Sequence, residues 1–164
     1  MKKAVFLDRD GVINREIGDY VCRIEDFQFN PGLFAALRLL QEYDYLFIVV
    51  TNQGGIAKGR YDFEDVDKVH DYMLDRLKEE GITIAEVYYC PHHHTIAPCL
   101  CRKPNSMMIE KAIAKYDIDA SQSFLIGDNE RDVEAGKKAG VQGILIEANT
   151  NIIPRVKMEI LNVV

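Results

Sequence analysis

Short, almost wholly apolar runs recur along the chain, separated by segments in which apolar residues return every three or four positions. Runs of four to six apolar residues are typical of strands buried on both faces, whereas the wider spacing is typical of helices with one buried side. The runs predict strands at residues 3–7, 45–50, 85–89, 123–126 and 143–146. The wider spacing predicts helices from about residue 30 to 43 and over 62–80, 107–116 and 130–140.

Local signals refine two of these helices. Asn30 is the expected N-cap of the first helix, with Pro31 at its first helical position. The second helix ends at Gly81, and its apolar side consists of Val66, Val69, Met73 and Leu77.

Regular alternation of strands and helices predicts an α/β fold: a doubly wound, Rossmann-like parallel sheet with helices on both faces. The 164 residues, 48% of them hydrophobic, fit a single domain covering 1–164. In such sheets ligands bind beyond the carboxyl ends of the strands. The residues at those ends are therefore the first candidates for a functional site.

Charge and apolar run length exclude several classes of function. A net charge of −6 argues against a nucleic-acid partner, which needs a basic face, although a small anionic substrate is still compatible with a local metal ion or a few cations. No apolar segment is long enough for a membrane span, and the apolar run near the N-terminus stops at Asp8, too early for a signal peptide. We therefore expect a cytoplasmic protein without a membrane partner. The lack of heptads or an apolar surface run favours a monomer.

Polar segments follow three of the predicted strands, and two of these segments contain aspartates. "DRDGV" (8–12) and "GDNERD" (127–132) come after two of the strands, and "TNQGG" (51–55) comes after a third. A single Asp after a strand is usually a turn or cap residue, but several carboxylates brought to one edge repel each other unless a cation or a proton intervenes. Oxygen ligands without His or Cys suit Mg²⁺.

These segments, together with Lys103 of "CRKP", resemble in order the four motifs of the haloacid dehalogenase (HAD) superfamily of phosphotransferases, and the resemblance covers nearly the whole chain. It implies a HAD-like phosphatase without a large cap domain. Asp8 would be the nucleophile that forms a phosphoaspartyl intermediate, and Asp10 the general acid and then the general base. Mg²⁺ would be held by Asp8, the backbone carbonyl of Asp10, and Asp128.

The same resemblance implies roles around the phosphoryl group. Thr51 would hydrogen-bond it, and Lys103 would pair with it and with Asp8. Asp132 is expected to be either a partner behind these residues or a helix-face residue. Asn52 and Gln53 would contact substrate hydroxyls or cap their loop.

The segment "CPHHHTIAPCLCRKP" (90–104) holds three of the four cysteines and three of the four histidines. Cys90, His92, Cys99 and Cys101 fit a closed tetrahedral Zn²⁺ site, which would be structural. His93 or His94 in place of His92, and a set of free thiols, are the alternatives. A metal here would order a zinc-binding loop directly before Arg102 and Lys103. Cys22 and His70 are expected to be a loop thiol and a helix surface residue.

A zinc loop in a small HAD-like phosphatase resembles two groups of enzymes, the heptose 1,7-bisphosphate 7-phosphatases and the histidinol-phosphate phosphatases. Residues 18–32 and 51–61 look more like the heptose group, whereas the short gap between His92 and Cys99 looks more like the other, and "RKPNSMM" departs from the "RKPHPGM" of the heptose enzymes. In the heptose group the residue at Arg102 contacts the phosphate that is not removed, a role that suits a planar guanidinium. Lys58 and Arg60 are either further phosphate contacts or solvated cations.

The expected substrate is therefore a small phosphorylated sugar, a heptose bisphosphate losing its 7-phosphate, in the supply of nucleotide-activated heptose. Histidinol phosphate and another sugar phosphate are the alternatives. A non-catalytic phosphate-binding or zinc-dependent interaction module is a further class, but it would be expected to lack Asp8 or Asp10, and both are present.

Overall fold

The computed structural model describes residues 1–164 and contains one five-stranded sheet in the order β3-β2-β1-β4-β5. All neighbouring strands are parallel, and Val5 at the centre lies opposite Phe47 on one side and Phe124 on the other. The strands are β1 Lys3–Leu7, β2 Tyr45–Asn52, β3 Ile84–Cys90, β4 Phe124–Gly127 and β5 Gln142–Leu145. The predicted doubly wound parallel sheet is confirmed.

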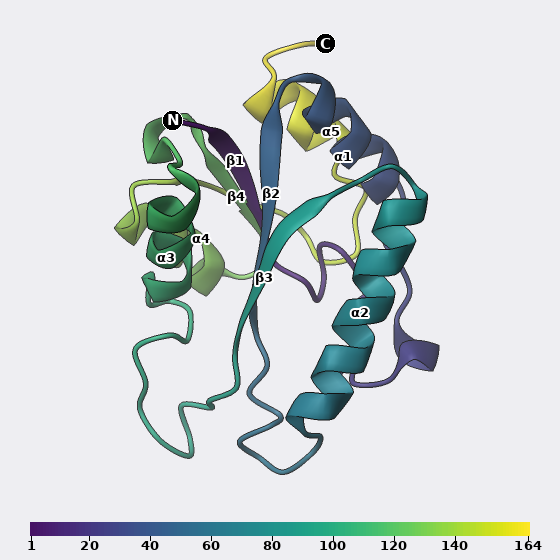
Figure 1. Ribbon diagram of the computed structural model, residues 1–164, viewed down its shortest axis with the longest axis vertical. Helices are drawn as coiled ribbons and strands as arrows, with labels where there is room; N and C mark the ends of the chain where they lie inside the picture. The colour runs from purple at the N-terminus through teal and green to yellow at the C-terminus, as the bar shows by residue number, and fades with distance from the viewer.

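Helices cover both faces of this sheet. The four longer ones are α1 Leu33–Glu42, α2 Phe63–Glu79, α3 Met107–Tyr116 and α4 Glu130–Lys138, and the short α5 Ile153–Arg155 continues into a π-helical turn, Val156–Ile160. Short 3-10 turns lie at Ile24–Asp26 and Ala120–Gln122. Figure 1 shows α1, α2 and α5 on one side of the sheet and α3 and α4 on the other, without a large cap domain. None of the helices is both long enough and apolar enough to span a membrane.

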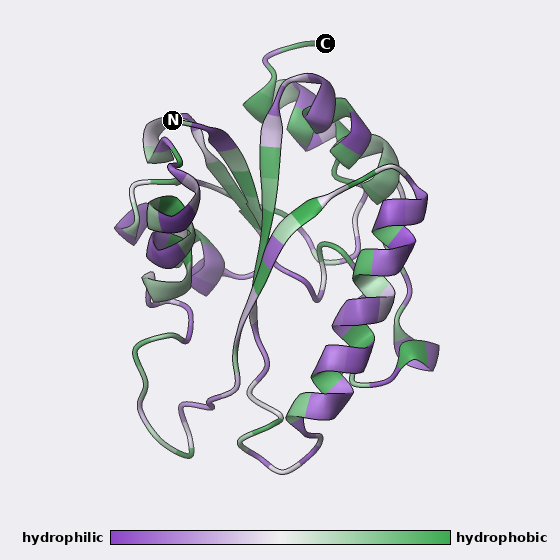
Figure 2. Cartoon of the chain, viewed as in Figure 1, coloured by the Kyte–Doolittle hydropathy of each residue, from purple (hydrophilic) through white to green (hydrophobic).

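Each face of the sheet packs its own hydrophobic cluster. Val5 and Leu7 of β1 face the cluster that contains the buried side of α1 and α2, whereas Ala4 and Phe6 face the cluster with α3 and α4. This division follows from the strand, because successive side chains point to opposite faces. Figure 2 accordingly shows β2 as mainly hydrophobic, while α2 alternates hydrophobic and hydrophilic residues.

The predicted start of the first helix was wrong. Gly32, not Asn30, precedes α1, and its φ of 76° lies in the left-handed region, so Pro31 cannot be the first helical residue. The buried Asn30 side chain instead donates from Nδ2 to the carbonyls of Val12 (3.1 Å) and Asn14 (3.3 Å). Its amide therefore ties down the loop that follows β1.

The topology defines where a ligand can bind. β1, β2 and β3 succeed one another towards one edge, and the chain then crosses back to place β4 on the other side of β1. The loops after β1 and β4 therefore diverge to opposite faces, which opens a crevice at their carboxyl ends. β2 is longer than predicted and includes Thr51 and Asn52, which places both residues at this same end.

Candidate active site

Three carboxylates meet at the switch point of the sheet. Asp8 directly follows β1, and Asp128 directly follows β4, while Asp132 lies in the first turn of α4. Oxygen atoms of the three side chains lie within 4.8 Å of one another. Gly11 makes this approach possible, because a Cβ at this position would lie 2.2 Å from Oδ2 of Asp128.

Lys103 is the cation within this group. Its buried Nζ donates to Oδ1 of Asp8 (2.8 Å), Oδ1 of Asp132 (2.7 Å) and the carbonyl of Val50 (2.8 Å). Burial alone would lower the pKa of Lys103, but the two carboxylates outweigh it and raise that pKa. Asp132 is thus a buried partner of Lys103, and it also forms a capping box with Asn129 at the start of α4.

The carboxylates carry more negative charge than one lysine balances. Burial, followed by repulsion from Asp132, raises the pKa of Asp8 well above its ordinary range despite the opposing effect of Lys103. The same two causes raise the pKa of Asp128. A cluster of oxygen donors with excess negative charge fits a hard divalent cation such as Mg²⁺.

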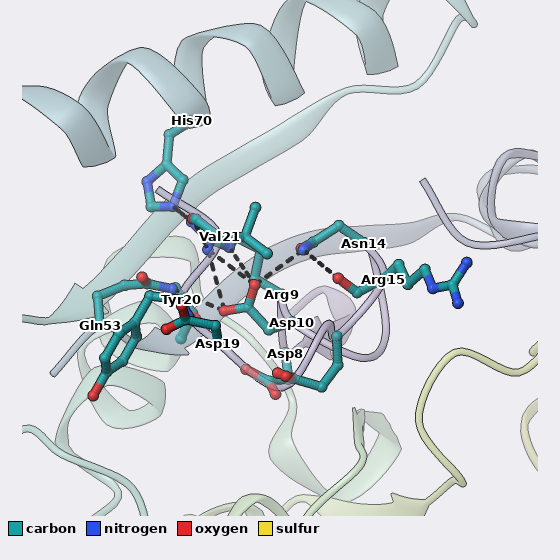
Figure 3. Close-up of polar contacts among 12 residues, drawn as sticks. Asp8, Arg9, Asp10, Asn14, Arg15, Asp19, Tyr20, Val21, Gln53 and His70 are labelled. Atoms are coloured by element: carbon teal, nitrogen blue, oxygen red, sulfur yellow. Dashed lines mark hydrogen bonds and ion pairs between the residues drawn. The ribbon is translucent and has the colours of Figure 1, made fainter. Parts of the chain in front are cut away.

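Asp10 lies in a different environment, although it is only two residues from Asp8. Its carboxylate accepts hydrogen bonds from Nη2 of Arg9 (2.9 Å to Oδ1), Nδ2 of Asn14 (3.0 Å to Oδ1) and Nε2 of Gln53 (3.1 Å to Oδ2) (Figure 3). The side chain of Asp10 is still 23% exposed, and it borders the same crevice as Asp8. The two aspartates are therefore held by separate sets of partners.

The residues at the end of β2 also have internal partners. Oγ1 of Thr51 accepts from Nε2 of Gln53 (3.0 Å), and Oε1 of Gln53 accepts from the hydroxyl of Tyr61 (2.7 Å). Asn52 is paired twice with the backbone of Lys103: its Nδ2 donates to the carbonyl (3.1 Å), and its Oδ1 accepts from the amide (3.0 Å). Both amide side chains thus hold the site together, and their predicted contact with substrate stays a prediction.

A crevice of about 300 Å³ opens over these groups. Its lining contains Asp8, Asp10, Thr51, Asn52, Lys103, Asp128 and Asp132. It also contains five residues to which the sequence patterns gave no individual role, namely Glu16, Asp19, Tyr20, Asn129 and Arg131. A second cavity, of about 460 Å³, is lined by Lys103 and Arg131 as well, together with Arg102. Burial, followed by repulsion from Arg131, lowers the pKa of Arg102. The two guanidinium groups therefore place positive charge beside the carboxylate cluster.

Lys58 and Arg60 line neither of these cavities. Arg60 forms an ion pair with Asp19 (3.1 Å), and both cations lie over the ring of Tyr20, 5.9 Å and 5.6 Å from its centroid. They tie the loop after β2 to the loop after β1, whose Asp19 and Tyr20 line the crevice.

The predicted zinc ligands are brought together in the loop after β3. Single ligand atoms of Cys90, His92, Cys99 and Cys101 all lie within 4.8 Å of one another. The Sγ atoms of Cys90 and Cys101 are 3.0 Å apart, and Nδ1 of His92 lies 3.2 Å from Sγ of Cys101. Their soft and borderline donors fit Zn²⁺.

The two neighbouring histidines, His93 and His94, make contacts outside this group of ligand atoms. His93 and His94 stack on each other with centroids 4.4 Å apart, and Nδ1 of His93 pairs with the hydroxyl of Thr95. Of the three consecutive histidines, His92 is thus the one with a ring nitrogen that lies among the cysteine sulfurs.

One expectation outside the motifs was wrong. His70 is not a surface residue of α2 but is only 5% exposed, and its Nε2 lies 3.2 Å from Nη1 of Arg9 (Figure 3). A signal for its burial was present, because His70 follows Val66 by four residues and precedes Met73 by three. Arg9 gave no such signal, since nothing local distinguishes a buried arginine beside two aspartates from a solvated one.

Comparison with known proteins places this arrangement in a family. A model of HAD-hydrolase-like proteins matches residues 100–151. The chain is 45% identical over 147 residues to the D-glycero-alpha-D-manno-heptose-1,7-bisphosphate 7-phosphatase of Campylobacter jejuni. The match covers 90% of this chain and 83% of that protein. The chain is 40% identical over 147 residues to the D-glycero-beta-D-manno-heptose-1,7-bisphosphate 7-phosphatase of Haemophilus influenzae, with 87% of this chain and 79% of the relative covered.

A solved structure agrees with the sequence relatives. The D,D-heptose 1,7-bisphosphate phosphatase from B. bronchiseptica, complexed with magnesium and phosphate, superposes with a TM-score of 0.84 at 31% identity, and the match covers 91% of this chain and 83% of that one. All three relatives are named for the heptose bisphosphate. The chain therefore belongs to the heptose-1,7-bisphosphate 7-phosphatase family of HAD-like hydrolases.

Proposed function

We propose that this protein is a Mg²⁺-dependent phosphatase that removes the 7-phosphate of D-glycero-D-manno-heptose 1,7-bisphosphate, in the supply of nucleotide-activated heptose. One observation carries the proposal: two aspartates two residues apart occupy different environments at the switch point. Asp8 lies against Lys103 and two further carboxylates, while Asp10 is held by neutral and cationic donors and stays open to the crevice. Two carboxyl groups with separate environments suit a nucleophile and an acid–base residue.

The chain's own residues would act in two steps. A carboxylate oxygen of Asp8 attacks phosphorus and the bond from phosphorus to the sugar oxygen breaks, while Asp10 gives its proton to the departing alkoxide. Asp10 then takes a proton from water, which attacks the phosphoaspartate and releases phosphate from Asp8. Thr51 and Lys103, which border the crevice, would hold the phosphoryl oxygens.

The carboxylate cluster fits the metal that such chemistry requires. Asp8, Asp128 and the backbone carbonyl of Asp10 would hold Mg²⁺. Burial, followed by repulsion from Asp132, raises the pKa of both side chains, and a bound cation would offset both effects. When bound, the ion would supply positive charge to the phosphoryl oxygens. The related structure from B. bronchiseptica holds magnesium and phosphate.

The arginines favour a bisphosphate over a monophosphate. Arg102 and Arg131 line one cavity that borders the crevice at Lys103, so a substrate whose reacting phosphate lies over Asp8 can extend its second phosphate towards them. Guanidinium groups bind phosphate in a bidentate manner. Glu16 and Asp19, across the crevice, are suited to accept hydrogen bonds from sugar hydroxyls.

Cys90, His92, Cys99 and Cys101 would hold a structural Zn²⁺ that orders the loop carrying Arg102 and Lys103. We further place the protein in the cytoplasm, as a monomer with one domain spanning residues 1–164.

Phosphate release in the presence of Mg²⁺ tests the proposal. The two anomers of heptose 1,7-bisphosphate and histidinol phosphate are compared at equal concentrations, and the bisphosphate is expected to be strongly preferred. Replacing Asp8 by Asn should abolish turnover, because an amide is not a nucleophile at phosphorus. A preference for histidinol phosphate would contradict the proposed substrate, and normal turnover by Asp8→Asn would contradict the assignment of Asp8 as the nucleophile.

A further inference from the structure

Arg9 separates the two aspartates in the sequence but points away from the crevice. Its side chain is only 1% exposed and does not line the crevice. Nε donates to Oδ1 of Asp10 (3.2 Å), and Nη2 donates to both carboxylate oxygens of Asp10 (2.9 Å and 3.2 Å) and to the carbonyl of Val21 (2.8 Å). One edge of the guanidinium is thus turned towards Asp10.

The opposite corner of the guanidinium is held by His70. Nη1 of Arg9 lies 3.2 Å from Nε2 of His70, on α2. Because a guanidinium has only donors, Nε2 must accept, and the imidazole must be neutral with its proton on Nδ1. Burial and the positive charge of Arg9 support this state, because they lower the pKa of His70 to about 3.

We infer that His70, acting through Arg9, is a positioning residue that fixes the Asp10 carboxylate for proton transfer to the leaving group. The inference rests on the proposed function, in which Asp10 is the general acid. A buried arginine without an acceptor at Nη1 would leave a donor unsatisfied, and this would favour a shift of the guanidinium towards another acceptor and away from Asp10. His70 and the carbonyl of Val21 prevent this, so that the guanidinium edge keeps facing Asp10 (Figure 3).

The orientation matters because proton transfer needs close contact. A general acid must lie within hydrogen-bond reach of the oxygen it protonates, and a displacement of about 1 Å costs on the order of a hundredfold in rate. Asn14 and Gln53 hold Asp10 from other directions, so the loss of His70 should weaken its placement rather than abolish it. A role confined to packing would instead affect every substrate alike.

Substrates with different leaving groups distinguish a role of His70 in positioning Asp10 from a role confined to packing. An alkyl phosphate expels a poor leaving group that needs the proton of Asp10, whereas p-nitrophenyl phosphate expels a stable phenolate that does not. In His70→Phe, which lacks the acceptor, kcat/KM for heptose bisphosphate should fall by about tenfold to a hundredfold. The value for p-nitrophenyl phosphate should change less than about threefold, because its phosphoryl transfer needs no acid.

A conservative variant and a packing control complete the experiment. In His70→Gln, whose side-chain oxygen can accept from Arg9, most of the loss should be restored. Val69→Ala, next to His70 in the core, should lower stability but leave the ratio between the two substrates unchanged. Equal losses on both substrates in His70→Phe, or no difference between Phe and Gln, would overturn the inference.

Failure of the proposed substrate appears separately, in the unmodified protein. If that protein hydrolyses glycerol 2-phosphate but not heptose bisphosphate, the proposed substrate fails and the leaving-group ratio is measured with glycerol 2-phosphate. If it hydrolyses no phosphomonoester, both proposals fail. Nitrogen-15 NMR gives a readout that needs no turnover, because Nε2 of His70 should be unprotonated at pH 7, and a protonated Nε2 would contradict the contact with Arg9.

Discussion

Lys103 is a buried cation whose three donors are all used within the protein. Two of its partners are the carboxylates of Asp8 and Asp132, which are themselves removed from water. Breaking a buried ion pair on one side is far more costly than the pair is worth, because the remaining charge lacks both water and a partner. Lys103 therefore supports the fold of the site as well as its proposed chemistry.

Replacing Lys103 by Met should destabilise the metal-free protein by about 3–5 kcal/mol at pH 7. Urea unfolding measures the difference. Lys115 is the matched control, because its ion pair with Glu86 is at the surface, where the lysine is 56% exposed. Lys115→Met should change the stability by less than about 1 kcal/mol. Similar losses in the two variants would show that Asp8 and Asp132 are not buried as described.

Single residues differ in how much of their position a sequence reveals. Asp8 and Asp128 were found because each follows a predicted strand, and the carboxyl ends of parallel strands bring such residues to one edge of the sheet. His70 lies on the apolar side of α2, but a lone histidine among charged residues resembles a surface residue. Its burial depends on Arg9, which is 61 positions away, and such a pairing is set by tertiary packing.

The loop between β1 and α1 contains Asp8 and Asp10 and packs against Asp128 at Gly11. Gly11 lies in this loop and has a φ of 91°, a value that residues with a side chain rarely adopt. A Cβ there would lie 2.2 Å from Oδ2 of Asp128, so any side chain would push that carboxylate out of the cluster.

Gly11→Ala should therefore raise the Mg²⁺ concentration needed for half-maximal activity by on the order of tenfold, because moving the groups that position a metal ligand commonly costs that much metal affinity. Activity is measured as a function of Mg²⁺. Gly81→Ala is the matched control: its φ of 76° is equally unfavourable, but no atom lies within 4 Å of the added carbon. This variant should lose about 1 kcal/mol of stability while keeping the Mg²⁺ requirement. An unchanged requirement in Gly11→Ala would contradict the placement of Asp128.

Elements were predicted well where one periodicity dominates. All five strands were found from their apolar runs, and α2 and α3 were placed within a residue or two. The start of α1 was misplaced because Asn30 and Pro31 fit a helix start locally, whereas the Asn30 amide is used by the preceding loop. The C-terminal α5 and the π-helical turn after it were not predicted, although Ile152, Val156 and Ile160 recur every four residues and are buried.

At the scale of the whole molecule, two sites lie at the same end of the sheet. The carboxylate cluster and the Cys/His cluster are separated in sequence, but β3 delivers Cys90 beside the end of β2, where Asn52 lies opposite Cys90. The sequence allowed this convergence to be predicted, because the carboxyl ends of parallel strands share one edge. It could not reveal that Asn52 holds Lys103, since the twofold pairing of Asn52 with the Lys103 backbone depends on the final path of the loop.

The pairing of Asn52 with the Lys103 backbone determines how the loss of zinc should affect Lys103 and Arg102. Cys101 directly precedes Arg102 and Lys103 in the sequence, so the metal cluster would anchor both cations. Lys103 is also held by Asn52, Asp8 and Asp132, whereas the Arg102 side chain has one hydrogen bond, from Nη1 to the carbonyl of His92 within the same loop (3.1 Å). Disordering the loop should therefore displace Arg102 more than Lys103.

Cys99→Ser should consequently lose its zinc, raise KM for the bisphosphate by on the order of tenfold, and lower kcat much less, because the second phosphate loses its anchor while the catalytic lysine stays in place. Metal analysis and steady-state kinetics measure both quantities. Cys22→Ser is the control, because this half-buried thiol lies outside the cluster and should leave zinc content and KM unchanged. Full zinc content in Cys99→Ser would exclude Cys99 as a ligand. A larger fall in kcat than rise in KM would mean that the metal, rather than Asn52 and the carboxylates, holds Lys103 in place.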